Sequence, residues 1–100
     1  MNTRTTRTTR KDVDAAFDAF LKAHNLRRAD NYADVGGYIL DYASVYGGYV
    51  IARIVNDGGG QDTPFGSRRR TAKEMEATLR FAADVKWTLD YEAERAARNA

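Results

Sequence analysis

The stretch Gly37-Tyr-Ile-Leu-Asp-Tyr-Ala-Ser-Val-Tyr-Gly-Gly-Tyr-Val-Ile-Ala-Arg-Ile-Val-Asn-Asp-Gly-Gly-Gly60 decides the fold of this chain. It contains two apolar segments rich in tyrosine and β-branched residues, a composition typical of strands. Tyr46-Gly47-Gly48 separates the two segments, and Gly58–Gly60 closes the second. Because adjacent glycines mark tight turns, the stretch predicts an antiparallel β-hairpin.

A three-residue turn at residues 46–48 predicts the register of this hairpin. In that register Asp41 lies opposite Arg53 as a cross-strand ion pair. A two-residue turn would bring a charged side chain opposite an apolar one, which is less favourable. One face of the predicted hairpin carries no charge and should be covered by helices; it comprises Tyr38, Leu40, Tyr42, Val50, Ala52 and Ile54.

Helical patterns flank the hairpin on both sides. Residues 9–24 carry apolar side chains at three- and four-residue spacing, behind a threonine cap at Thr8 or Thr9. A second helix begins at Thr71, where Glu74 gives the spacing of a capping box. Its charged end, residues 92–98, predicts a segment that projects from the body. Its broad apolar side predicts contacts with both the hairpin and another helix; this side comprises Met75, Thr78, Leu79, Phe81, Ala82, Val85, Lys86, Trp87 and Leu89.

Length and composition predict one small α+β domain over residues 11–100, preceded by a disordered, basic tail over residues 1–10. The formal net charge is only +2, but residues 1–11 carry four bases and no acid. The absence of cysteine excludes disulfides and thiolate metal sites and fits a reducing cytoplasm. No apolar run approaches the roughly 20 residues of a membrane span, so no membrane association is expected.

The Gly58–Gly60 loop and Arg68–Arg70, which lead into the second helix, are the candidates for an anion site. Backbone amides at Gly59 and Gly60, three guanidinium groups and a helix N-terminus would together suit a phosphate. The spacing matches neither a P-loop nor a dinucleotide fingerprint. The alternative, that the glycines turn the chain and the arginines are solvated, is therefore favoured over an anion site.

Tyr46 and Tyr49, with the nearby Arg53, are the candidates for a protein-binding surface. Tyrosine and arginine are enriched at interfaces, and the turn of a hairpin is exposed in most folds. The only histidine, His24, is expected to pack at the end of the first helix, so no metal site is predicted. Neither Ser44 nor Ser67 has a neighbouring Asp-His pattern. We therefore expect a protein that is not an enzyme and needs no cofactor.

The middle of the chain contains a series of short elements: Tyr38-Ile-Leu, Ala43, Tyr46-Gly-Gly, Arg53-Ile-Val-Asn-Asp-Gly-Gly-Gly60, Asp62, Phe65-Gly66 and Arg70-Thr-Ala-Lys-Glu-Met75. Through these elements, residues 35–85 resemble a small uncharacterised protein that recurs in tailed-bacteriophage genomes. The resemblance implies a phage-encoded, non-structural accessory protein made in the host cytoplasm, and it brings no known activity or site residues. The first expectation is that such a protein binds a host protein. There are two alternatives: it binds nucleic acid through the basic tail and Arg68–Arg70, or it sequesters an anionic nucleotide. A homodimer formed through the open hairpin face is also expected to be accessible.

Overall fold

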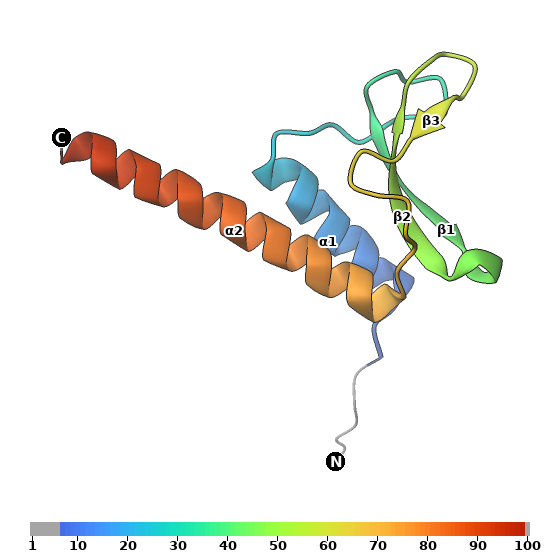
Figure 1. Cartoon of the computed structure of the whole chain (residues 1–100), viewed down its shortest axis with the longest axis horizontal. Coiled ribbons are helices and arrows are strands. Elements are labelled where there is room, and N and C mark those ends of the chain that lie inside the picture. Colours follow the sequence, from blue (N-terminus) through green and yellow to red (C-terminus); the bar gives the residue numbers. More distant parts are fainter. Residues whose placement is uncertain (1–6, 100) are drawn as a thin grey trace.

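The computed structural model describes residues 7–99 and has an α+β fold, as the sequence predicts (Figure 1). Most of the basic tail, residues 1–6, lies outside the described residues. The two helices lie side by side and begin at the same end of the molecule, with the sheet packed beside them. In chain order the elements are α1 (Arg10–Ala23), β1 (Tyr38–Ala43), the 3₁₀ turn η1 (Ser44–Tyr46), β2 (Gly48–Ile54), β3 (Gln61–Asp62) and α2 (Ala72–Arg98).

Both helices begin at capping boxes; the sequence predicts the one at Thr71, and for α1 it predicts only a threonine cap at Thr8 or Thr9. The Thr9 side chain accepts a hydrogen bond from the Asp12 amide at 3.2 Å, and the Asp12 carboxylate accepts one from the Thr9 amide at 2.9 Å. Thr71 and Glu74 repeat this reciprocal arrangement at the start of α2. Each pair satisfies two of the backbone amides that a helix N-terminus leaves without partners.

The core lies between the two helices and one face of the sheet. Val13 and Phe17 of α1 and Met75 and Leu79 of α2 are each at most 1 % exposed. From the sheet, this cluster takes Tyr38, Tyr49 and Ile51, with Leu40 partly buried against it.

The register of the hairpin differs from the prediction. Asp41 lies opposite Val50, not Arg53, so each β1 residue pairs three residues earlier on β2 than expected. The reason is the turn: it has four residues, formed by η1 and by Gly47 in the left-handed conformation at φ 97°. Because side chains alternate between the two faces of a strand, a shift by an odd number of residues exchanges the faces of β2 relative to β1. Tyr49 and Ile51 therefore face the helices. The sequence predicts Val50, Ala52 and Ile54 on that face.

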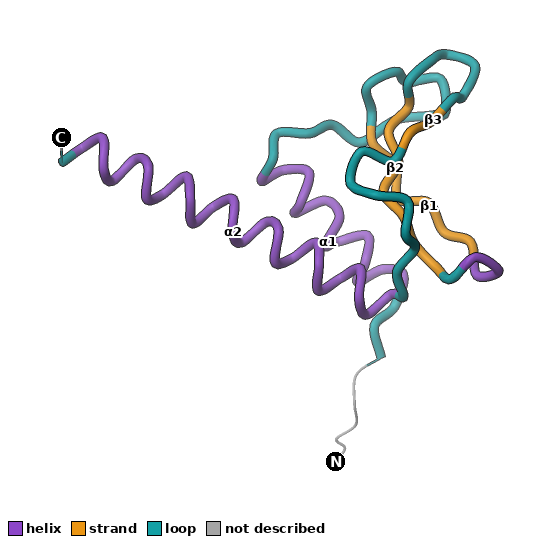
Figure 2. The backbone as a smooth tube through the Cα atoms, in the orientation of Figure 1, coloured by secondary structure: helices purple, strands orange, loops and turns teal. Residues whose placement is uncertain are grey.

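The sheet has three strands where the sequence predicts two, in the order β1-β2-β3 (Figure 2). The central strand β2 pairs with β3 near its end, through Arg53 with Asp62 and Ile54 with Gln61. Near its start β2 also exchanges two hydrogen bonds of 2.8 Å with the backbone of Arg70. The segment before α2 therefore runs along the second edge of β2 and joins the sheet to the helix.

Candidate functional site

The hairpin turn is the part of the predicted protein-binding surface that the structure leaves open to solvent. Tyr46 is 75 % exposed and its neighbour Val45 is 86 % exposed. Tyr49, in contrast, is 4 % exposed and belongs to the core, with its ring centre 4.7 Å from that of Tyr42. The prediction that Tyr49 is exposed beside Tyr46 is therefore wrong, because the four-residue turn places Tyr49 on the helix-covered face.

Arg53 lies at the opposite end of the hairpin from Tyr46. It sits across from Tyr38 on β1 and Asp62 on β3, and its Nη2 donates to Asp62 Oδ2 at 2.6 Å. The hydrogen bond to Asp62 raises the pKa of Arg53, and Tyr38 adds to this effect. The predicted ion pair with Asp41 does not form. Arg53 instead fastens β3 to β2, so the three residues predicted to bind a protein do not form one surface.

The Gly58–Gly60 loop is folded around the side chain of Asn56. Oδ1 of Asn56 accepts hydrogen bonds from the backbone amides of Gly58 at 3.0 Å and Gly60 at 2.9 Å. The Gly59 amide donates to the Asn56 carbonyl at 3.2 Å. Because all three amides already have partners, this loop does not present an open cradle for an anion.

Arg69 holds the segment before α2 against the hairpin. Its Nη2 donates to the carboxylate of Asp41 at 2.6 Å, and its Nη1 donates to the carbonyl of Gly48 at 2.9 Å. The side chain of Arg69 is 21 % exposed. Because this guanidinium already forms hydrogen bonds with two groups of the protein, Arg69 stabilises the fold and has few donors free for a ligand.

Arg70 and Arg68 are likewise separated from the glycine loop. Arg70 pairs with Tyr49, whereas Gln61, next to the glycine loop, pairs with Ile54. Tyr49 and Ile54 are five residues apart on the extended strand β2, a separation of about 17 Å. Arg68 is exposed on the approach to α2. The structure therefore does not bring together the glycines and arginines that the sequence suggested as one anion site.

The helix N-termini already hold carboxylates of their own. The hydrogen bond from the Thr9 backbone lowers the pKa of Asp12, and the hydrogen bond from the Thr71 backbone lowers the pKa of Glu74. Both carboxylates are therefore charged at neutral pH and complement the positive ends of the helix dipoles.

The exposed apolar residues of α2 form a candidate site that the sequence reading missed. We call Phe81, Val85, Trp87, Leu89 and Tyr91 the outer surface of α2. Phe81 is 70 % exposed, Leu89 62 % and Trp87 52 %. The prediction that this broad apolar side contacts the hairpin is wrong beyond the first turns of the helix.

The outer surface is exposed for two reasons. Phe81 lies about 160° around the helix from the buried Leu79 and Ala83, so it faces away from α1. The other four residues lie beyond Ala83, where α1 no longer covers α2. Past the end of α1, the His24 ring lies 3.2 Å from the Ala82 carbonyl through Nε2. Ala83 is the last buried residue of α2 within the described residues. From there α2 extends alone (Figures 1 and 2). The signal available in the sequence was the unequal length of the two predicted helices.

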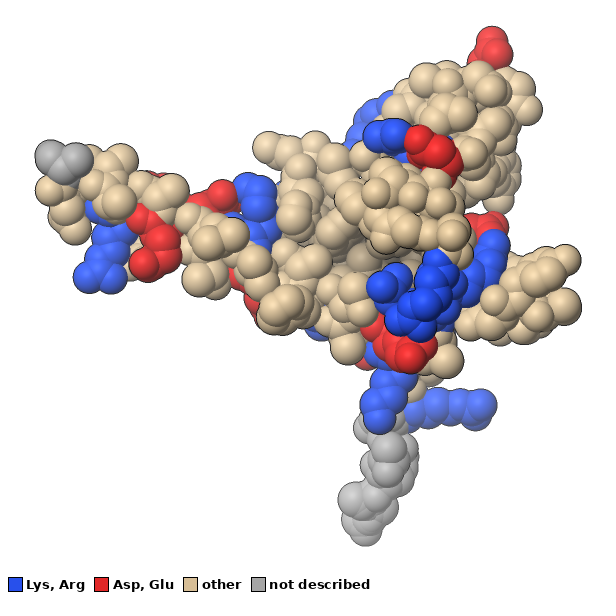
Figure 3. Space-filling model, in the orientation of Figure 1, with Lys and Arg blue, Asp and Glu red and all other residues tan. Residues whose placement is uncertain are grey.

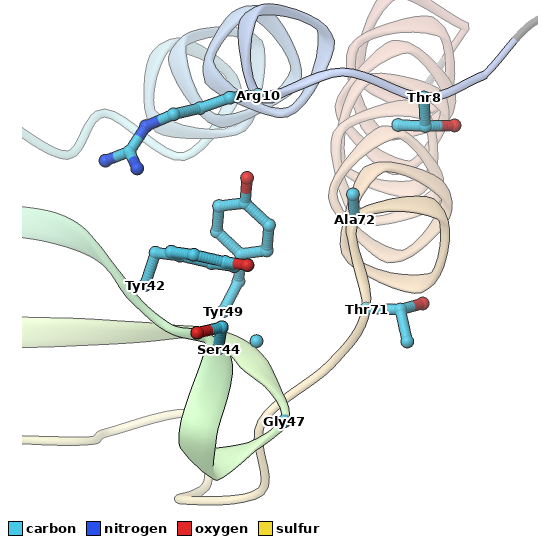
Figure 4. A pocket seen from close by; sticks show the side chains of 9 residues that line it. Thr8, Arg10, Tyr42, Ser44, Gly47, Tyr49, Thr71 and Ala72 are labelled. Atoms are coloured by element: carbon cyan, nitrogen blue, oxygen red, sulfur yellow. The ribbon is translucent and has the colours of Figure 1, made fainter.

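A cavity of about 440 Å³ opens at the other end of α2, where both helices begin. Arg10 and Thr71 line it from the helix starts, and Tyr42 and Ser44 line it from the hairpin (Figure 4). The guanidinium of Arg10 lies 5.7 Å from the centre of the Tyr42 ring. Basic side chains gather around this end of the molecule (Figure 3).

The described part of the chain offers no cluster of three metal-ligating side chains among its His, Asp and Glu residues. Over the same residues, neither helix combines the length and apolar character needed to cross a bilayer. No family model, characterised protein or solved structure matches this chain. Any function must therefore be argued from the surfaces described above.

Proposed function

We propose that this protein is a non-catalytic, phage-encoded accessory protein that binds a host protein through the outer surface of α2. The observation that carries the proposal is the exposure of five large apolar side chains between residues 81 and 91 of α2. Neighbouring exposed apolar side chains mark interaction sites in soluble proteins, and here they form two groups on opposite sides of one helix. The phage origin and the host rest on the resemblance of residues 35–85 alone.

The arrangement of these side chains indicates how a partner would hold the helix. Phe81, Val85 and Leu89 recur every four residues, so at 100° per residue they lie within about 80° of one another on one side. Trp87 and Tyr91 are also four residues apart, and they lie on the opposite side. A partner that buries both sides must surround the helix with an apolar groove, the mode of recognition in which a helix lies in a groove.

The projecting segment is already helical before any partner binds. Isolated helices of about 12–15 residues are marginal in water, and ion pairs at four-residue spacing stabilise them. Lys86 pairs with Asp90, and Glu94 pairs with Arg98 at 3.7 Å. A preformed helix loses less conformational entropy on binding, and Trp and Tyr are enriched among residues that dominate binding energy.

The test is capture of proteins from a lysate of the bacterial host after nuclease treatment, using two matched double variants. Phe81→Ser with Leu89→Ser removes apolar area from α2, whereas Val45→Ser with Tyr46→Ser removes apolar area from the hairpin turn. All four residues are exposed, so both variants should stay folded. The proposal predicts that a captured protein is lost only with the α2 variant. Loss only with the turn variant, or retention by both, would contradict it.

Self-association is examined on the same variants by light scattering. A dimer of the parent chain that dissociates in the α2 variant would make a second copy of this chain the occupant of the outer surface. A parent chain that stays monomeric is what the proposal predicts.

A further inference from the structure

The end of the molecule where both helices begin carries exposed basic side chains that form no direct ion pair within the described residues. We call Arg7, Arg10, Lys11, Arg68 and Lys73 the basic end; all five residues are exposed. None of them forms an ion pair with another residue in the range 7–99. Figure 3 shows blue side chains gathered where the two helices begin.

Acidic side chains near the basic end already have hydrogen-bond partners of their own. Asp12 and Glu74 are held at the helix starts by the capping boxes, and Asp41 is held by Arg69. These carboxylates reduce the net charge but are fixed by their hydrogen bonds. The five basic side chains of the basic end are exposed and therefore accessible to phosphate groups, which Lys and Arg neutralise.

An aromatic ring lies inside this positive region. Tyr42 is 45 % exposed, and its ring leans on the buried ring of Tyr49 with centres 4.7 Å apart. The contact holds Tyr42 at the wall of the 440 Å³ cavity, between the hairpin and the start of α1 (Figure 4). Arg10 is exposed and its guanidinium lies over the ring, so a cation and an aromatic face meet at the wall of this cavity.

We propose that the basic end binds single-stranded nucleic acid. One nucleobase stacks on Tyr42, and the five Lys and Arg side chains bind the flanking phosphates. An aromatic platform within a basic groove is the general means of holding single strands without reading their sequence. The ring lies in a cavity, where the bases of a duplex cannot reach it without leaving their stack. This inference concerns a surface separate from the outer surface of α2.

The test is fluorescence anisotropy with a labelled oligodeoxythymidine of about a dozen nucleotides, within the site sizes of single-strand binders. We expect binding at about 50 mM salt that weakens steeply by about 200 mM. Tyr42→Ala should weaken binding about tenfold, and Tyr42→Phe should bind like the parent chain, because stacking needs the ring and not the hydroxyl. Tyr91→Ala, which removes an exposed tyrosine of α2, is the matched control and should change nothing.

Charge is tested with a second pair of variants that does not depend on Tyr42. Arg10→Ala with Lys11→Ala should weaken binding and reduce the slope of log affinity against log salt by about 1.4, since each phosphate contact contributes about 0.7. Arg95→Ala with Arg98→Ala removes equal charge from the far end of α2 and should leave the slope unchanged.

Three results would overturn the inference: no binding of the oligonucleotide at low salt, equal losses in the test and control variants, or tighter binding of a duplex of the same length. The variant Phe81→Ser with Leu89→Ser should bind the oligonucleotide normally. Failure of this inference is therefore distinguishable from failure of the protein-binding proposal.

Discussion

Gly48 shows how a single residue fixes the join between the hairpin and the segment before α2. Its φ is +121°, and a Cβ placed on it would lie 2.2 Å from the carbonyl oxygen of Arg70. Gly47 has a comparable φ of +97°, but a Cβ there would meet nothing closer than 3.9 Å. Substitution of Gly47 therefore tests backbone strain alone, whereas substitution of Gly48 tests strain together with steric overlap.

Gly48→Ala should lower the free energy of unfolding by about 3 kcal/mol or more, because the strand must move away from Arg70. Gly47→Ala should cost only about 1–2 kcal/mol, the cost of a left-handed conformation for alanine. Urea denaturation of both variants measures the difference. Equal losses would show that the close approach to Arg70 does not constrain the fold.

The capping role of Glu74 makes the stability of the fold depend on pH in the acidic range. Its pKa in the folded protein is lowered, so the charged carboxylate stabilises the fold at pH values above its ordinary range near about 4. This contribution is lost as the pH falls through the folded pKa. Glu74→Gln should therefore flatten the decline of thermal stability between about pH 5 and pH 3, measured by circular dichroism. A decline as steep as that of the parent chain would contradict the role of this carboxylate.

At the scale of the elements, α2 divides into a half that builds the core and a half that does not. Leu79 is 1 % exposed against α1, whereas Leu89 is 62 % exposed ten residues later on the same helix. The same substitution at these two positions therefore has different consequences.

Leu79→Ala should destabilise the fold by about 2–5 kcal/mol, the usual cost of truncating a buried leucine. Leu89→Ala should change the free energy of unfolding by no more than about 0.5 kcal/mol while weakening partner binding. Chemical denaturation and partner titration of the two variants check this separation. A large loss of stability in Leu89→Ala would show that α2 packs along its whole length.

The helices could be predicted from the sequence more fully than their packing. The boxes Thr9–Asp12 and Thr71–Glu74 are local patterns, so both helix starts were predictable. The hairpin register was not, because it depends on a 3₁₀ turn and on the distant Arg70 backbone. The buried position of Tyr49 follows from that register and was missed with it.

The exposure of the outer surface of α2 was also missed, and for the four residues after Ala83 the reason is the length of α1. Apolar spacing shows that a helix has an apolar side, and it does not show whether a neighbour reaches that side. Helix α1 has 14 residues and α2 has 27, so they are about 21 and about 40 Å long. The shorter helix cannot cover the longer one.

As a whole the molecule is an extended body with two different ends. Its Cα radius of gyration is 16.0 Å, against about 13 Å for a compact domain of 100 residues. The sheet and the helix starts form the body, with the basic end on it, and α2 extends away from it (Figures 1 and 3). We infer that the two ends serve different partners, a protein at the outer surface of α2 and a single strand at the basic end.

The most direct test of the central claim uses Trp87, the only tryptophan of the chain, which lies on the outer surface of α2. At 52 % exposure, its fluorescence should be readily quenched by acrylamide in the free protein. The protein is titrated with the captured host protein, prepared so that it has no tryptophan fluorescence of its own. We predict that the emission of Trp87 shifts to the blue and that Trp87 is protected from acrylamide, because the groove encloses this side of the helix. A partner that binds while the emission and quenching of Trp87 stay unchanged would contradict the account.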